Sequence, residues 1–237
     1  LLNPQKIYKS IDKGVNWAPL TSTNLPVSSS AIRRIEILSD GSILALGNSG
    51  GLGRIYKSID GGATFNQKFV STFNTNYAGT TTNPRIPIES GNVVAMVGTV
   101  PREGLVISID KGDTWTVKPF PTSIISSDPT EFPFVGSMAF DGTTILATTI
   151  VNSGIPNWVT QLVKSTDNGT SWTVVPTPGP TTNLSYGKRF VVLPGGAYLL
   201  TLQNPFFDCY RSSDKGATWT NVGNFGGYPV IQSTSIL

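Results

Sequence analysis

The sequence predicts an all-β fold, a β-propeller of four-stranded antiparallel blades. A short phrase, Ser-x-Asp-x-Gly-x-(Thr/Ser/Asn)-(Trp/Phe), occurs five times in 237 residues, and its aspartates recur at intervals of 47 to 57 residues. Periods of this length are typical of solenoids, propellers or arrays. Between the phrases, short β-branched or alternating runs are separated by turn residues, and helix signals are nearly absent.

The second repeat shows the strands of one unit most clearly. Its β-type runs cover residues 32–38, 42–47, 54–58 and 64–70, with Ser-Asp-Gly and Gly-rich turns between them. Four such runs in about 50 residues match one propeller blade. The repeated phrase falls between the third and fourth strands of each unit, so it is predicted to form the hairpin that joins them.

The residues of the phrase suit a tight turn. An aspartate side chain can accept backbone N–H bonds, a serine hydroxyl can add another, and Gly62 and its equivalents allow a positive φ. The aromatic residue that follows is expected to bury against the neighbouring sheet, which contributes on the order of 2–3 kcal/mol. Structural roles are therefore predicted for Asp12, Asp60, Asp110, Asp167, Asp214, Trp17, Phe65, Trp115, Trp172 and Trp219.

Several chemistries are disfavoured by composition. Histidine is absent and Cys209 is the only cysteine, which excludes Ser-His-Asp and Cys-His nucleophile systems and Cys/His zinc sites. The turn phrase lacks the run of carboxylates that a calcium loop needs. No metal or cofactor is expected.

The charge pattern also limits the partners. The net charge is +3, and lysine and arginine are scattered without a basic run, so no nucleic acid partner is indicated. No apolar run reaches the roughly 18 residues of a membrane span. The chain begins with Leu1, which favours a mature or excised piece of something larger.

Five nearly even phrases predict one propeller domain over residues 1–237, most simply with five blades. The chain starts just before a third strand and ends after a candidate first strand, residues 228–236. Either the terminal strands share one thin blade and close the ring, which would remove exposed sheet edges, or the piece is cut from a longer chain.

The phrase resembles the Asp-box, or bacterial neuraminidase repeat, and the whole chain resembles the sialidase-like propellers that carry it. The same phrase occurs in xyloglucanase-type glycosidases, sortilin-type receptors and non-enzymatic lectins. The resemblance implies the fold, but it leaves function open because the box marks outer hairpins away from the central channel.

Sialidases bind the substrate carboxylate with three arginines, and the resemblance implies three candidate arginines in this chain. Arg85 stands in an Arg-Ile-Pro match, 25 residues before its box aspartate, and Arg34 and Arg189 lie 26 and 25 residues before theirs. Each would open the innermost strand of its blade and face the channel, where guanidinium groups can bind an anionic group. The alternative is that these arginines pair with neighbours such as Glu36 or Glu89.

The arginine set is incomplete, because the matching position of the fourth unit is read as apolar, at Val135 or a neighbour. The catalytic set is poorer still. Residues 184–200 faintly resemble the family's tyrosine stretch and would nominate Tyr186 as nucleophile, but no glutamate base can be assigned to it by motif. The loop expected to hold the acid/base aspartate carries only Glu103, and Glu131 lies in another loop with Asp128.

These observations favour a non-enzymatic module for glycan binding, adhesion or assembly, at a virion or cell surface or otherwise extracellular, with a glycan or a protein as partner. The alternative is a sialidase-like glycoside hydrolase that acts on acidic sugars through Arg34, Arg85 and Arg189 with Tyr186. A scaffold without a ligand is the third hypothesis. The aromatic residues proposed to stack on sugar rings are Trp158, Phe134, Phe206, Phe207 and Tyr228.

Overall fold

The chain forms two compact units, residues 1–117 and 118–237, and each is described by itself. The computed structural model describes residues 7–25, 32–49, 52–74, 88–97, 105–121, 134–152, 158–179, 189–204 and 206–224. In these ranges the regular secondary structure consists of β-strands. None of them contains a helix of the length and apolar character needed to cross a membrane.

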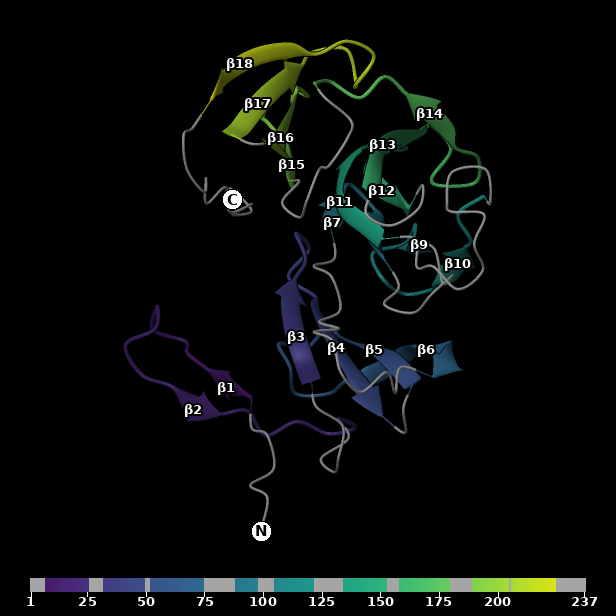
Figure 1. Cartoon of the computed structure of the whole chain (residues 1–237). Helices are drawn as coiled ribbons and strands as arrows, with labels where there is room; N and C mark the ends of the chain where they lie inside the picture. Colours follow the sequence, from purple (N-terminus) through teal and green to yellow (C-terminus); the bar gives the residue numbers. More distant parts are fainter. Residues whose placement is uncertain are drawn as a thin grey trace. The chain divides into compact units, whose positions relative to one another are not determined.

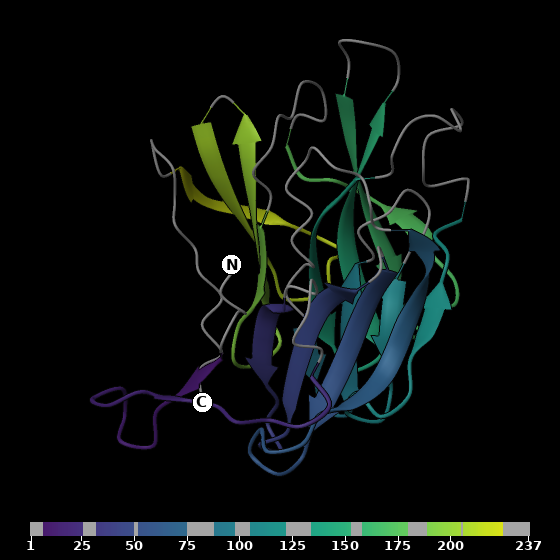
Figure 2. The ribbon, with the colours of Figure 1, turned by 90° about the horizontal axis from the view of Figure 1, so that it is seen from below.

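The first unit holds a two-stranded ribbon and two four-stranded sheets (Figure 1). The ribbon pairs β1 with β2, antiparallel. The sheet orders are β3-β4-β5-β6 and β10-β9-β8-β7, and Figure 2 shows β3 to β6 side by side in chain order. The strands are β1 (Tyr8–Lys9), β2 (Ala18–Pro19), β3 (Ile32–Ile37), β4 (Ile43–Ser49), β5 (Leu52–Ser58), β6 (Asn66–Asn74), β7 (Ile88–Ser90), β8 (Val93–Val97), β9 (Leu105–Ser108) and β10 (Thr116–Lys118).

The second unit holds two more four-stranded sheets, β11-β12-β13-β14 and β15-β16-β17-β18. Every adjacent pair of strands in these two sheets is antiparallel. The strands are β11 (Phe134–Asp141), β12 (Thr144–Asn152), β13 (Trp158–Ser165), β14 (Thr173–Val175), β15 (Arg189–Val192), β16 (Tyr198–Asn204), β17 (Phe206–Ser212) and β18 (Thr220–Asn224).

The cores lie between consecutive sheets because the buried strands are apolar on both faces. On β4, Leu44 and Leu46 join a cluster with Val94 of β8, whereas Ala45 joins a different cluster with Phe65. This period-two division is the pleat of a strand that packs on two sides. In the second unit, one cluster joins Leu146 and Leu162 of one sheet to Tyr198 and Leu200 of the next.

Four antiparallel strands in chain order, repeated and stacked through apolar faces, make each sheet a propeller blade. The predicted fold class is therefore confirmed, and the four strands predicted for the second repeat correspond to β3 to β6. The described residues contain four complete sheets and the β1–β2 ribbon. A count of five blades and a single domain over residues 1–237 stay predictions.

Candidate functional site

The five repeated turns have the same internal hydrogen bonds. In the second turn, the Ser58 hydroxyl donates to Asp60 Oδ1 at 2.7 Å and accepts the Gly62 N–H at 2.9 Å, and the Thr64 N–H donates to Asp60 Oδ1 at 2.9 Å. The matching bonds around Asp12, Asp110, Asp167 and Asp214 are 2.7–2.9 Å long. Each aspartate thus satisfies the backbone of its own turn.

These hydrogen bonds stabilise the ionised carboxylates. For Asp214, the Thr218 hydroxyl, the Thr218 N–H and the Ser212 hydroxyl lower the pKa to about 2. Burial acts to raise the pKa of Asp110, but hydrogen bonds from Thr114 and Ser108 outweigh it and lower the pKa to about 2. The same kind of bond lowers the pKa of the other three aspartates. Such acids stay ionised at neutral pH and are poor proton donors.

Backbone geometry explains why glycine ends each turn. In each turn, one residue that varies among the five copies separates the aspartate from a glycine. That glycine has φ between 78° and 95° in all five turns, as predicted for Gly62. The variable residue itself is also left-handed, at φ 55–68°, and it is Lys13, Gly61, Lys111, Asn168 or Lys215. Two consecutive left-handed residues reverse the chain in a way that branched side chains resist.

Three of the turns approach a leucine that precedes them in the chain very closely. A Cβ added to Gly62 would lie 2.9 Å from Leu20, one on Gly112 would lie 3.1 Å from Leu44, and one on Gly216 would lie 2.7 Å from Leu146. Leu44 and Leu146 are themselves fully buried. Glycine is therefore required both for conformation and for close approach to the preceding sheet.

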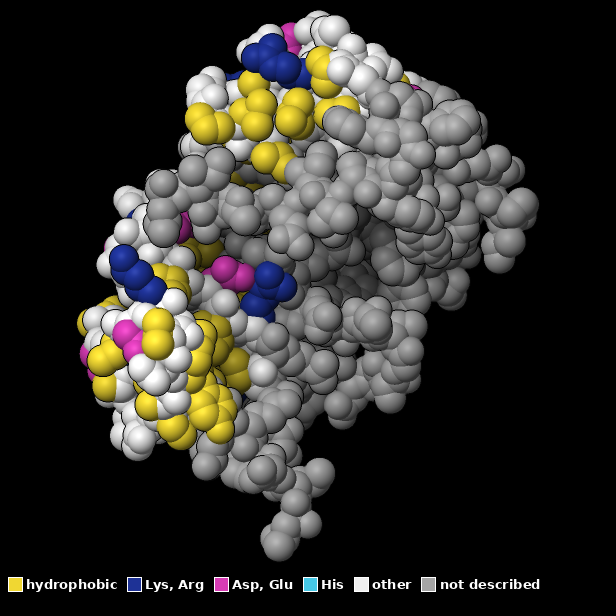
Figure 3. Space-filling view, turned by 90° about the vertical axis from the view of Figure 1, so that its left-hand side faces the viewer, with side chains coloured by type: hydrophobic (Ala, Val, Ile, Leu, Met, Phe, Trp, Pro, Cys, Tyr) yellow, Lys and Arg dark blue, Asp and Glu magenta, His cyan; other side chains and the backbone are white. Residues whose placement is uncertain are grey.

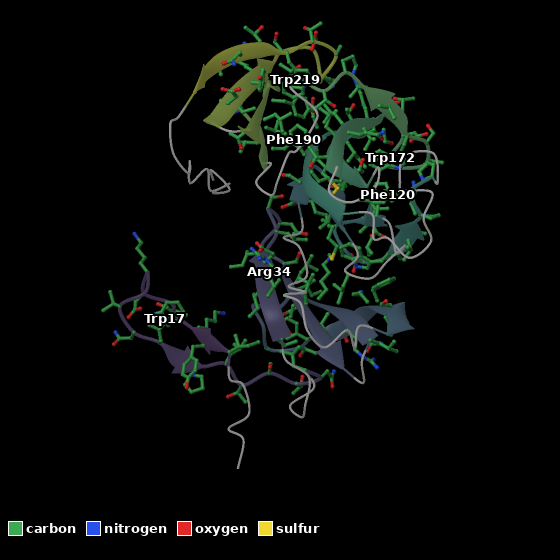
Figure 4. The ribbon with its side chains drawn as sticks, in the orientation of Figure 1. Trp17, Arg34, Phe120, Trp172, Phe190 and Trp219 are labelled. Carbon is green, nitrogen blue, oxygen red and sulfur yellow. The ribbon has the colours of Figure 1, made fainter. Side chains whose placement is uncertain are left out.

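The aromatic residues of the turns follow the same rule, with one exception. Phe65 is 0% exposed, Trp172 is buried against Phe120 with ring centroids 5.0 Å apart, and Trp115 and Trp219 are partly buried (Figure 4). Trp17 is 62% exposed, so the prediction that it buries against a neighbouring sheet is wrong. Trp17 belongs to the first turn in the chain, and no described sheet precedes that turn on which its ring could pack.

Arg34 is the predicted ligand residue whose side chain the structure describes, and it forms an ion pair. Its Nε donates to Glu36 Oε1 at 2.7 Å, and the two side chains are 32% and 29% exposed. Both lie on β3, the end strand of its sheet (Figure 4). Within the described part of the chain, the two terminal guanidinium nitrogens make no bond. The alternative that the sequence left open, pairing with Glu36, is therefore what the structure shows.

A β-bulge sets the direction of Arg34. The register of β3 against β4 shifts between Ile32 and Arg34, which places Arg34 opposite Leu46. Bulges of this kind re-aim side chains and are over-represented next to active sites. The sequence does carry a signal for this bulge, because Arg33 and Arg34 are adjacent polar residues that interrupt the alternation between Ile32 and Ile35.

The same bulge occurs on β11, between Val135 and Ser137, and it corrects the apolar assignment of that unit. The register places polar Ser137 opposite Thr148, where β3 has Arg34 opposite Leu46. The Ser137 hydroxyl accepts the Phe190 N–H at 2.9 Å. At this position, the second unit therefore has a hydrogen bond that joins two of its sheets.

The other nominated residues divide into two groups. Arg189 opens β15 opposite Thr201, in the register position of Arg34, but its side chain is outside the described part, as are those of Trp158, Phe134, Phe206 and Phe207. The residues that lie wholly outside the described ranges are Arg85, Tyr186, Glu103, Asp128, Glu131 and Tyr228. No cluster of three His, Cys, Asp or Glu side chains suited to a metal occurs among the described residues.

Comparison with known proteins places the chain near propellers. No family model matches it. A xyloglucanase from Paenibacillus sp is 28% identical over 96% of this chain, which spans only 24% of that enzyme. The structure titled YCF48 bound to D1 peptide is 15% identical, with TM-score 0.52, over 93% of this chain and 62% of that one.

Solved glycosidase structures are also among the matches, at lower TM-scores. The Hadza microbial sialidase Hz136 is 17% identical, with TM-score 0.48, over 81% of this chain and 46% of that one. The structural neighbours include sialidases and arabinanases. At 15% identity and a TM-score of 0.52, the likeness to the YCF48 structure concerns the fold alone.

Proposed function

We propose that this chain is the glycan-binding propeller of a glycoside hydrolase-like protein, with the Arg34–Glu36 pair at its ligand site and a neutral polysaccharide as ligand. The observation that carries the proposal is the geometry of the pair. A cationic and an anionic side chain lie 2.7 Å apart on a bulged end strand, and the two are 32% and 29% exposed. The five turns with the same hydrogen bonds support an Asp-box propeller. The xyloglucanase relative supports a place outside the cell.

The pair suits hydroxyl groups better than a carboxylate. Glu36 compensates the charge of Arg34, which weakens its attraction for a second anion. The remaining guanidinium N–H groups donate and the carboxylate oxygens accept, so the pair offers both functions to neighbouring sugar hydroxyls. The xyloglucanase relative, matched over 96% of the chain, supports a neutral polysaccharide.

Binding of xyloglucan oligosaccharides, measured by titration calorimetry, tests the proposal. We expect binding that weakens on the order of tenfold in Glu36→Gln and in Arg34→Gln, because each change leaves the partner unpaired. Lys215→Gln is the matched control, since Lys215 is an exposed cation paired with Asp141 elsewhere in the chain. Absence of xyloglucan binding by the unmodified chain would refute the proposal.

The second candidate is hydrolysis of acidic sugars by Arg34, Arg85 and Arg189 with Tyr186. It is favoured by the shared register of Arg34 and Arg189 on the first strands of their sheets. A fluorogenic sialoside tests it: turnover that is lost in Tyr186→Phe would support this candidate over the first. Binding of xyloglucan oligosaccharides without sialoside turnover would support the first.

A further inference from the structure

Glu36 stands at a register position where the other four-stranded sheets of the described chain have apolar residues. This position is on the first strand of each sheet, opposite the residue that follows the partner of the turn serine. On β4 that residue is Leu44, since Ile43 pairs with Ser58, and Glu36 lies opposite Leu44. The matching first-strand residues of the other sheets are Ile88, Ala139 and Val191. Packing of the sheets therefore does not require a carboxylate here.

The face of the sheet that carries Glu36 is apolar where it meets the next sheet. Cross-strand partners lie on the same face of a sheet, so Arg34 and Glu36 share a face with Leu46 and Leu44. Both leucines are buried in one cluster with Val94 of the following sheet, within the same unit. Charges at the edge of such a cluster are less screened than charges in open water. The carboxylate of Glu36 therefore acts strongly on the charge of Arg34.

The ion pair uses one side of the guanidinium group. Arg34 Nε donates to Glu36 Oε1 at 2.7 Å, and the two terminal nitrogens donate to no acceptor among the described residues. Guanidinium groups bind carboxylates through two parallel N–H bonds. The two side chains are 32% and 29% exposed, and cationic and anionic side chains lie next to each other near the centre of the face in Figure 3. The donors of Arg34 are thus open to a second carboxylate, and the charge of Glu36 opposes it.

We propose that Glu36 determines the class of sugar at this site, because its charge disfavours acidic sugars and leaves neutral ones unaffected. This inference rests on the proposed function. While Glu36 is ionised, a carboxylate on the ligand lies near a like charge, and like charges across an interface exclude wrong partners. Without the carboxylate of Glu36, Arg34 is an uncompensated cation with two free donor nitrogens, which suits a carboxylate.

A matched pair of ligands tests the proposal. One is a xyloglucan oligosaccharide, and the other is the same oligosaccharide with primary alcohols oxidised to carboxylates. Titration calorimetry of the unmodified chain should show the neutral form bound on the order of tenfold more tightly than the oxidised form. In Glu36→Gln the order should reverse, because the oxidised form should bind on the order of tenfold more tightly than it does to the unmodified chain. High salt should reduce this gain, since it depends on charge.

The controls separate the site from net charge. Asp141→Asn also removes one carboxylate and frees a cation elsewhere in the chain, Lys215, which is 54% exposed, and it should not gain binding of the oxidised form. Arg34→Gln added to Glu36→Gln should abolish the gain. Glu36→Val should reproduce it, since it copies Val191, which stands two residues after Arg189 on β15.

The outcomes distinguish this inference from the proposed function. If the unmodified chain binds the neutral form but Glu36→Gln gains no binding of the oxidised form, the inference is overturned and the proposed function stands. An equal gain in Asp141→Asn would also overturn the inference. If the unmodified chain does not bind the neutral form but Glu36→Gln alone gains the oxidised form, the proposed function is refuted and the role of Glu36 is supported. Absence of binding in every chain would refute both.

Discussion

The first and second repeated turns have nearly the same sequence and the same hydrogen bonds, yet their aromatic residues differ in solvent exposure. Asp12 and Asp60 each accept a serine hydroxyl and a backbone N–H at 2.7–2.9 Å. Phe65 is nonetheless fully buried, whereas Trp17 is 62% exposed. The comparison shows that the turn forms from local bonds, while burial of its aromatic ring depends on a preceding sheet.

The largest expected effect is on the buried aromatic residue. Phe65→Ala should lower the free energy of unfolding by about 3–5 kcal/mol, because it leaves a cavity between sheets. Trp17→Ala should cost less than about 1 kcal/mol, because Trp17 is 62% exposed. Urea unfolding of both variants measures the difference. Equal losses would show that Trp17 is covered in solution.

The second effect concerns a cation that a following turn buries. Asp113→Asn should cost about 2 kcal/mol, because Lys57, which is 4% exposed, and Lys68 would both lose the charge of Asp113, which is itself 49% exposed. Asp141→Asn is the control: its partner Lys215 is 54% exposed, so the loss should stay below about 1 kcal/mol. Thermal unfolding of both variants compares them, and a similar loss in each would mean that water reaches Lys57.

The third effect isolates the close approach of a turn to a sheet. Gly62→Ala and Gly14→Ala both place a Cβ at φ of 90–95°, which costs about 1 kcal/mol in each. Only Gly62→Ala also meets Leu20, at 2.9 Å, so it should cost about 1–2 kcal/mol more. Indistinguishable midpoints in urea would show that Leu20 moves aside freely.

The smallest effect is on pH dependence and should be common to covered and uncovered turns. The folded pKa of Asp214 is about 2, below its ordinary value of 3.8, so the folded chain binds fewer protons than the unfolded chain. The stabilisation is complete above about pH 4 and is lost as the pH falls towards 2. Carboxyl NMR titration measures it. Ser212→Ala should raise the pKa of Asp214, and Ser10→Ala that of Asp12; an unchanged pKa would contradict the role of the serine.

The sequence predicted what depends on local chemistry. The serine, aspartate and glycine of each phrase lie within five residues, so their spacing alone predicts the turn, and the runs around Ile43 and Ile55 predict strands. It could not predict the exposure of Trp17, because that depends on which sheets stack. The bulges before Arg34 and Ser137 were not predicted, although the sequence marks both. Arg33 and Arg34 interrupt the alternation, and a glycine inside a strand, here Gly136, is typical of a bulge.

The local character of the turn bonds has a consequence for how the chain folds. Each carboxylate closes a loop of only a few residues, so little chain entropy opposes its formation, and hairpins of this kind form within microseconds. We therefore expect the five hairpins to arise early and independently of one another. Stacking of sheets, which joins residues some 50 positions apart, would follow as the slower step and set the overall folding rate.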